Sequence, residues 1–185
     1  MKITTIGRGT IGGTLARLWR SAGHDVTELG RDGGDAAGAD VVLLAVPSAS
    51  VPAALSQVTG LSGKLVIDAT NRLGDGDLPD GQPSIAEFVK ATTNGPTAKA
   101  FNLNFGKLFD QAQNAPEPPH NLWVGDEDAR AAVEQLTRDI GMEAVHGGPL
   151  TSAAAQEAFA QLYITAVQDL DAGLLFYRFF APKPQ

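Results

Sequence analysis

Three glycines near the start of the chain have the spacing of a nucleotide-binding loop. Gly7, Gly9 and Gly12 form the pattern G-x-G-x-x-G, directly after the β-branched stretch 3–6 and before the helix-favouring stretch 14–19. In that context the first glycine permits a tight turn, the second lets the backbone approach a pyrophosphate, and the third lets the helix pack closely. The first N–H groups of the helix add donors for phosphate oxygens. The pattern therefore predicts a dinucleotide cofactor at this loop.

The residues after the second expected strand indicate which dinucleotide is bound. The strand 25–29 is followed by Gly30, Arg31 and Asp32. An arginine here can form charge-assisted hydrogen bonds to the 2′-phosphate of NADP(H), Gly30 leaves room for that group, and Arg8 of the glycine loop can approach it. Asp32 has the spacing from the loop at which an NAD site commonly places a carboxylate for the ribose 2′-hydroxyl. NADP(H) is the predicted cofactor, and NAD is the alternative.

The sequence offers few groups for acid–base or metal chemistry. It has no cysteine and three histidines, so we expect no metal site. His146 ends an expected strand near the active edge and is a candidate for substrate contact, whereas His24 is expected in a turn and His120 in solvent. Asp68 is expected to anchor the turn after its strand by local hydrogen bonds. No catalytic residue is assigned, because the expected strand ends carry no Lys, His or Glu pair.

These residues must be positioned by alternating strands and helices, which predict an α/β fold with a Rossmann-type doubly wound parallel sheet. Residues 1–150 are expected to form the NADP-binding domain and residues 151–185 a C-terminal helical extension. Ser48 is an expected helix cap, and 74–83 an expected surface loop. The strands are expected at 3–6, 25–29, 40–47, 63–68, 98–101, 122–125 and 142–146, and the helices at 10–22, 48–58, 84–90, 126–140 and 152–180.

Composition narrows the classes of partner. The chain has 185 residues, 43% of them hydrophobic, with a net charge of -7 and a pI near 4.8. It contains no long basic cluster, so nucleic acid and anionic membrane surfaces are not expected partners. No apolar run approaches the ~18 residues that a membrane span requires, and no leader precedes the first strand, so a cytoplasmic location is expected. The aromatic cluster 176–180 is expected to fill an interface in a homodimer, and the alternative is that it covers a flavin-like ring at the acceptor site.

Seven short motifs follow one another in the order found in a known family. On these motifs the chain resembles the deazaflavin-dependent NADP oxidoreductases, also called NADPH:coenzyme F420 oxidoreductases. The wider group includes the NADPH-binding reductase domain of the Steap metalloreductases. A-V-P, D-A-T-N and K-A-F-N are the distinctive pieces. The motifs are G-R-G-T-I-G at 7–12, G-H-D-V at 23–26, G-R at 30–31, L-A-V-P at 44–47, V-I-D-A-T-N at 66–71, K-A-F-N at 99–102 and G-G-P-L at 147–150.

The resemblance implies a role for each motif. Residues 9–11 would contact the pyrophosphate, the two arginines named above would bind the 2′-phosphate, and residues 45–47 would line the path from adenosine to nicotinamide. Asn71 and Asn102 would flank the nicotinamide. The implied cofactor-binding set is Gly7, Arg8, Gly9, Thr10, Ile11, Gly12, Gly30, Arg31, Ala45, Val46, Pro47, Asn71, Ala100 and Asn102.

Three positions depart from the family pattern. Arg8 stands where a small hydroxyl residue is common, Leu103 where threonine usually follows K-A-F-N, and Tyr163 where tryptophan is frequent. These positions lie at the cofactor edge and the acceptor pocket. They bear on the identity of the electron acceptor more than on the dinucleotide.

The function implied is NADP(H)-dependent hydride transfer to or from a small-molecule acceptor, with a deazaflavin or flavin as second substrate. Such a transfer requires stacking, alignment and exclusion of water, and no acid–base residue. One alternative is a non-catalytic dinucleotide sensor. Another is a small hydroxyacid or imine reductase, which needs a proton donor or acceptor. No lysine occurs between Thr151 and Tyr177, which leaves Tyr163 for that role.

Overall fold

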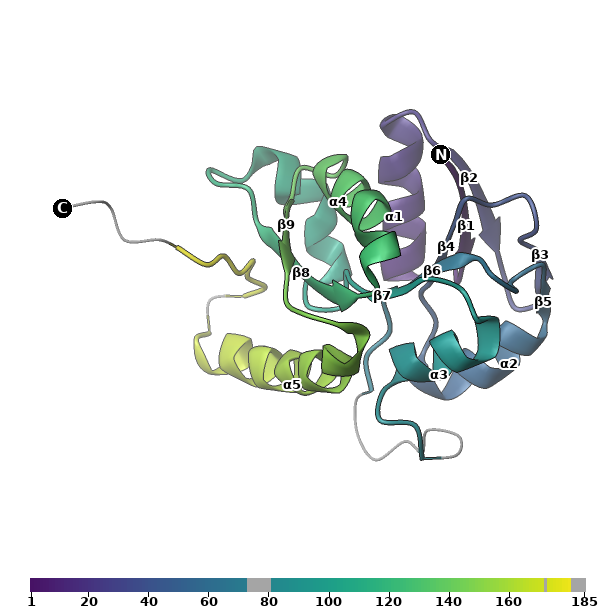
Figure 1. Cartoon of the computed structure of the whole chain (residues 1–185). Coiled ribbons are helices and arrows are strands. Elements are labelled where there is room, and N and C mark those ends of the chain that lie inside the picture. The colour runs from purple at the N-terminus through teal and green to yellow at the C-terminus, as the bar shows by residue number, and fades with distance from the viewer. Residues whose placement is uncertain (73–80, 172, 181–185) are drawn as a thin grey trace.

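A seven-stranded sheet forms the centre of the molecule (Figure 1), a computed structural model that describes residues 1–72, 81–171 and 173–180. Its strand order is β2-β1-β4-β6-β7-β8-β9. Neighbouring strands are parallel except β7 and β8, which are antiparallel. The Rossmann-type fold expected from the sequence is therefore confirmed. The strands are β1 (Lys2–Ile6), β2 (Asp25–Leu29), β4 (Val41–Leu44), β6 (Leu65–Asp68), β7 (Thr97–Lys99), β8 (His120–Gly125) and β9 (Glu143–His146).

Helices cover both faces of this sheet (Figure 1). One face carries α1 (Thr10–Ser21), α4 (Arg130–Arg138) and the 3-10 segment η3 (Gly106–Asn114). The other carries α2 (Val51–Ser56) and α3 (Ile85–Thr93), with α5 (Ala153–Asp169) beside α3. Of the helices in the described ranges, none is long and apolar enough to cross a bilayer.

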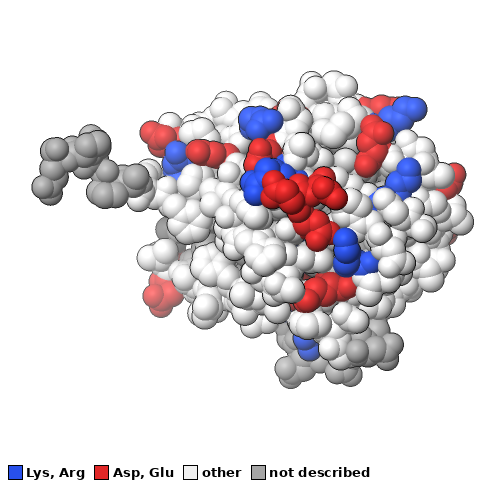
Figure 2. Space-filling view, viewed as in Figure 1, with Lys and Arg blue, Asp and Glu red and all other residues white. Residues whose placement is uncertain are grey.

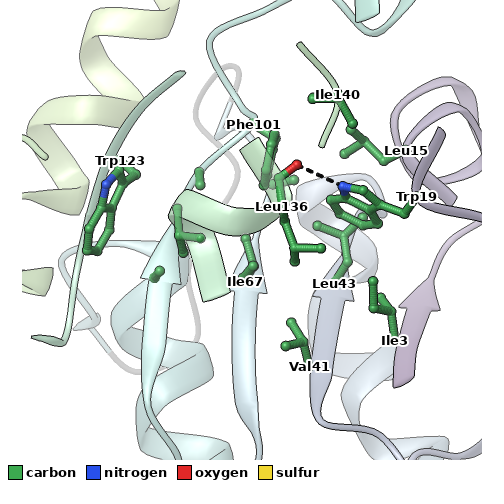
Figure 3. Close-up of a cluster of buried hydrophobic side chains, with 14 of the residues drawn as sticks. Ile3, Leu15, Trp19, Val41, Leu43, Ile67, Phe101, Trp123, Leu136 and Ile140 are labelled. Carbon is green, nitrogen blue, oxygen red and sulfur yellow. Dashed lines mark hydrogen bonds between the residues drawn. The ribbon is translucent and has the colours of Figure 1, made fainter. Parts of the chain in front are cut away.

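The larger core cluster lies under α1 and α4. Figure 3 shows Trp19 of α1 reaching across to α4, where its indole Nε1 donates to the carbonyl oxygen of Leu136 over 3.0 Å. Phe101, just after β7, packs edge-to-face between Trp19 and Phe109, with ring centroids 5.6 Å and 6.3 Å away. Buried aromatic pairs in this arrangement stabilise the core beyond their area alone. The cluster therefore fixes the chain directly after β7, where one of the expected site motifs lies.

The helix expected at 48–58 is shorter than the sequence indicated. Ser48 begins a 3-10 turn, η1 (Ser48–Ser50), and is not a helix cap, while α2 ends at Ser56. The β-branched pair Val58–Thr59 forms β5 instead, which pairs with β3 (Gly34–Asp35) in a separate two-stranded sheet. Cross-strand pairing thus replaces the last expected turn of the helix.

The helix expected at 152–180 also ends early. After η5 (Leu150–Ser152), α5 stops at Asp169, and Asp171 and Gly173 then adopt φ angles of 46° and 76°. Left-handed residues of this kind commonly end helices. Residues 173–180 form no regular element and lie along β8, where His120 N donates to the Tyr177 carbonyl oxygen over 3.1 Å. Phe176 packs against the core from this segment, whereas Leu174, Phe179 and Phe180 are exposed, so the apolar residues of 173–180 do not belong to a longer helix.

Two more helices differ from the expected bounds, and one expected loop lies mostly outside the described residues. The helix expected at 126–140 is a 3-10 turn, η4 (Glu127–Ala129), followed by α4. The helix expected at 84–90 runs to Thr93, with Ser84 as its N-cap. Most of the loop expected at 74–83 lies outside the described residues. The division of the chain at residue 150 stays a prediction.

Candidate functional site

The glycine loop crosses the carboxyl end of β1 with almost no space for side chains. Gly7 has a φ of 110°, and a Cβ there would lie 2.3 Å from the carbonyl oxygen of Ala45. A Cβ on Gly12 would lie 2.1 Å from the carbonyl oxygen of Gly7. Gly7 N also donates to the Leu29 carbonyl oxygen over 3.0 Å. The loop is therefore held tightly against α1, β2 and the end of β4.

Gly9 differs from its two neighbours in the motif. It is the N-cap of α1, and a Cβ on it would meet no protein atom within 4 Å. The first N–H groups of a helix lack partners within the helix and attract anions. The backbone at Gly9 thus borders open space at a helix N-terminus, as a phosphate-binding loop requires.

A first cavity of about 760 Å³ lies on the β2 side of the loop. Arg8 extends into it from the loop and lies against Gly30, since a Cβ on Gly30 would fall 2.2 Å from Arg8 Nη2. The end of β4 supplies the facing wall. The lining residues are Ile6, Gly7, Arg8, Gly9, Gly30, Arg31, Asp32, Ala45, Val46, Pro47, Ser50, Ala53, Ala54 and Gln57.

Two arginines in this cavity form no ion pair within the part of the chain that the structure describes. The guanidinium groups of Arg8 and Arg31 make no hydrogen bond or ion pair with any residue that the structure describes. Glu28, near the end of β2, is already bound by Arg20 at 2.7 Å. Asp32 lines the same cavity, so a carboxylate is also present. Two arginines and one carboxylate in the same cavity leave an excess of one positive charge there, which fits an anionic group.

A second cavity of about 460 Å³ lies on the other side of the loop. Its wall is mainly apolar, and α5 contributes Tyr163, whose ring is 5.7 Å from that of Phe105. Thr10 and Ile11 of the loop border it, so residues 7–11 separate the two cavities. The lining residues are Thr10, Ile11, Asn71, Asn102, Leu103, Asn104, Phe105, Gly106, Lys107, Ala160, Tyr163, Ile164 and Leu174.

The expected pair Asn71 and Asn102 meets in this wall. Asn71 Nδ2 donates to the Asn102 carbonyl oxygen over 2.6 Å, and Asn102 Nδ2 donates to Asn71 Oδ1 over 2.9 Å. Phe101 has a φ of 61°, which is rare for an aromatic residue and is held by its buried ring. This turn directs the chain so that Asn102 reaches Asn71. Of the expected set, Gly12 and Ala100 are buried and line neither cavity.

A buried charge cluster beneath this wall was not expected from the sequence. Lys99 Nζ donates to Asp68 Oδ2 and to Glu157 Oε1, both over 2.8 Å, and all three side chains are almost fully buried. Glu157 Oε1 also accepts from Ile85 N at the start of α3. Asp68 Oδ1 accepts from Thr70 N over 2.9 Å, as expected for a turn anchor. Lys99 ends β7 and Glu157 lies on α5, so this pair joins a strand end to a helix, and the expectation of no catalytic residue stays a prediction.

The two histidine expectations were reversed. His120 is 6% exposed, and its backbone oxygen accepts from Asn104 Nδ2. Desolvation and the nearby Arg178 lower the pKa of its imidazole. His146 is exposed and stacks on Trp123. Because β8 runs antiparallel to β7, the start of β8 lies at the edge that carries the cavities, and the end of the parallel strand β9 lies at the opposite edge.

Tyr163 is poorly suited to proton transfer. Burial raises the pKa of its phenol to about 12, and its hydroxyl donates to the Leu175 carbonyl oxygen. At neutral pH it therefore stays protonated and engaged. No group of three or more metal-ligating side chains occurs in residues 1–72, 81–171 and 173–180.

A known family shares part of this site. Residues 29–72 match the family model described as NADP oxidoreductase coenzyme F420-dependent. The resemblance drawn from the sequence is thereby confirmed. The matched segment runs from the end of β2 to the residue after Asn71, so it includes the first cavity's Arg31 and the β4 wall. No curated protein matches the chain.

Solved structures of oxidoreductases share the fold. A protein from Arthrobacter sp. FB24, described as an F420-dependent NADP-reductase, is 22% identical over 98% of this chain and all of its own, with a TM-score of 0.83. A reductive aminase from Aspergillus terreus, solved with NADPH and ethyl levulinate, is 18% identical over 93% of this chain, with a TM-score of 0.66. The 3-hydroxyisobutyrate dehydrogenase of Mycobacterium tuberculosis is 17% identical over 91%, with a TM-score of 0.65. This chain spans 62% and 61% of the last two.

Proposed function

We propose that the protein is an oxidoreductase that binds NADP(H) across the glycine loop. The adenosine and its 2′-phosphate would occupy the first cavity, the pyrophosphate would lie over Gly9 at the start of α1, and the nicotinamide would enter the second cavity. The observation that carries this proposal is the pair of arginines, Arg8 and Arg31, that line the first cavity without an anionic partner among the described residues. A 2′-phosphate supplies that anion, whereas the 2′-hydroxyl of NAD does not.

The second cavity supports hydride transfer to a flat, apolar acceptor of the flavin or deazaflavin type. None of its lining residues is aspartate, glutamate or histidine; its ionisable side chains are the exposed Lys107 and Tyr163, whose hydroxyl already donates to the Leu175 carbonyl oxygen. Such a wall can stack and align two rings and exclude water, while the cofactors supply the chemistry. We expect the protein to oxidise NADPH, followed by the absorbance at 340 nm, when a deazaflavin, FMN, a ferric chelate or a quinone is added in turn. If none of the four acceptors supports NADPH oxidation, the proposed hydride transfer is wrong.

Two other functions receive less support. One is reduction of a hydroxyacid or an imine, because two of the solved structures with this fold are a hydroxyacid dehydrogenase and a reductive aminase. Such an enzyme requires a proton donor or acceptor beside the substrate. Lys99 is sealed beneath the wall, with 0% of its side chain exposed, which leaves Lys107 and Tyr163 as the lining side chains that could donate a proton. A non-catalytic sensor would be favoured if Leu103 or the terminal aromatic residues filled the second cavity. Leu103 and Leu174 line that cavity without filling it.

The glycine loop provides a test that separates binding from folding. Gly9→Ala should leave Tm within about 1 °C of the wild type, because its Cβ meets no protein atom, but should weaken NADPH binding at least about tenfold, since the methyl group would occupy the pyrophosphate position. Gly12→Ala should lower stability by about 1–3 kcal/mol, because its Cβ would meet a backbone oxygen. Calorimetric titration and thermal unfolding measure the two effects. Unchanged NADPH affinity in Gly9→Ala would exclude the loop as the pyrophosphate site.

We also propose a homodimer, formed through the outer face of α5. Phe159, Leu162 and Leu170 are 37%, 69% and 63% exposed, and the only charged residues of α5 are the buried Glu157 and Asp169 at its end. Figure 2 shows mostly uncharged surface over this helix, whereas the rest of that face mixes acidic and basic side chains. Exposed apolar surface of this kind commonly marks an interface.

Leu162→Glu should convert this dimer to a monomer, since it places a carboxylate in the apolar face. Light scattering after gel filtration would report a mass near twice 19.3 kDa for the wild type and near 19.3 kDa for the variant. Gln168→Glu, which adds the same charge at an exposed position of α5, serves as the control. A wild-type monomer at all concentrations would exclude this interface.

A further inference from the structure

Gln156 of α5 touches the asparagine pair from behind the wall of the second cavity. Its Nε2 lies 2.7 Å from Asn102 Oδ1, 3.0 Å from the Leu122 carbonyl oxygen and 3.3 Å from the Lys99 carbonyl oxygen. All three neighbours are acceptors. The amide nitrogen of Gln156 must therefore face them, and its orientation is fixed.

The other end of the same side chain is left without a partner. Gln156 is 3% exposed, and its Oε1 has no hydrogen-bond partner among the residues that the structure describes. A buried unpaired acceptor is unfavourable, by roughly 1–3 kcal/mol. An apolar side chain of similar length would avoid that cost. The hydrogen bonds that Gln156 Nε2 donates are therefore the reason to have glutamine at this position.

That nitrogen sets the direction of the hydrogen bonds in the wall. Because Gln156 donates to Asn102 Oδ1, the Nδ2 of Asn102 is turned toward Asn71 and donates to its Oδ1. Asn71 must then donate its own Nδ2 to the Asn102 carbonyl oxygen. Each asparagine nitrogen carries two hydrogens and uses one within the pair. Both asparagines line the second cavity, and each has a second N–H that the pair does not use.

We propose that Gln156 is a positioning residue that makes this wall a hydrogen-bond donor. The ligand group that lies against Asn71 and Asn102 is then an acceptor, such as the carboxamide oxygen of the nicotinamide. This inference rests on the proposed function for the identity of that ligand, but the amide chain itself does not depend on it.

The neighbouring residue on α5 holds the helix in register for this contact. Glu157 accepts from Lys99, and Lys99 forms an ion pair with Asp68. Asp68 and Lys99 lie three residues before Asn71 and Asn102, respectively. Two consecutive residues of α5 thus engage the same two strand ends, Glu157 at the ion pair and Gln156 at the amide pair. A shift of α5 would break both contacts together.

The first test follows the amide chain without any ligand. The side-chain NH₂ signals of Asn71 and Asn102, assigned with Asn→Asp variants, should shift in ¹H–¹⁵N spectra of Gln156→Met and Gln156→Glu. They should stay in place in the control Gln168→Glu, which makes the same change at an exposed position of α5. Should the glutamate variant fail to fold, the methionine variant, which adds no charge, decides the result. Unmoved signals in a folded Gln156→Met protein would overturn the proposal.

The second test compares NADPH with 2′,5′-ADP, which contains the adenosine half alone. Gln156→Glu should weaken NADPH binding at least about tenfold and leave 2′,5′-ADP within about twofold of the wild type. Equal losses for both ligands, or no loss for either, would contradict a role at the nicotinamide. If the wild type binds neither ligand, the proposed function fails, while the spectra still decide whether Gln156 orients the asparagine pair.

Discussion

Replacing Arg31 by alanine is expected to weaken NADPH binding by about 10- to 100-fold and to leave NADH binding within about twofold. A hydrogen bond to a charged group contributes about 1.5–3 kcal/mol, and every 1.4 kcal/mol is roughly tenfold in Kd. Arg8→Ala should have a similar effect, because both arginines line the same cavity. Both side chains are exposed, so the loss should shrink at high ionic strength.

Controls for this experiment come from the same chain. Arg17→Ala removes an exposed arginine of α1 that pairs with Asp110, and it should leave the affinities for NADPH and NADH unchanged. Asp32→Asn tests the competing carboxylate. If Asp32→Asn selectively weakens NADH binding while Arg31→Ala changes neither affinity, the cofactor is NAD and the assignment of the 2′-phosphate to the arginines is wrong.

The largest loss of stability is expected for Lys99→Met. The substitution leaves the carboxylates of Asp68 and Glu157 buried without their cation. Removing one partner of a buried ion pair costs about 3–5 kcal/mol, which lowers Tm by roughly 6–20 °C in a domain of this size. Thermal and urea unfolding of the purified wild type and variant would measure the loss in Tm and in the free energy of unfolding.

Lys107→Met is the matched control for that prediction. It makes the same substitution at an exposed lysine and should change the free energy of unfolding by less than about 0.5 kcal/mol. A free energy of unfolding for Lys99→Met within about 1 kcal/mol of the wild type would mean that the three charges contribute no more than an apolar packing would.

Local sequence signals were sufficient for the glycine loop and most of the sheet. The turn at Gly7 and the strand Val41–Leu44 follow from neighbours in the chain, because glycine spacing and a continuous apolar run are local patterns. The same holds for Ser84 at the start of α3, whose hydroxyl oxygen accepts from Glu87 N. Such features need no knowledge of distant contacts.

The wall of the second cavity could not be predicted in this way. Lys99 and its partner Glu157 are 58 residues apart in the sequence, and Gln156 and its partner Asn102 are 54 residues apart. A buried lysine or glutamine has no distinctive spacing, since its partners come from other elements. The histidines were misplaced for a related reason: the antiparallel placement of β8 against β7 is a property of the sheet, and alternating strands and helices indicate only parallel neighbours.

The proposed 2′-phosphate site in the first cavity consists of Arg8 and Arg31, which have no anionic partner among the described residues. Its most direct test is calorimetric titration of the wild-type protein with NADPH and NADH at low and high ionic strength. We expect NADPH to bind at least about tenfold more tightly at low ionic strength, with the ratio falling as salt screens the exposed arginines. Equal affinities at low ionic strength, or tighter binding of NADH, would contradict it.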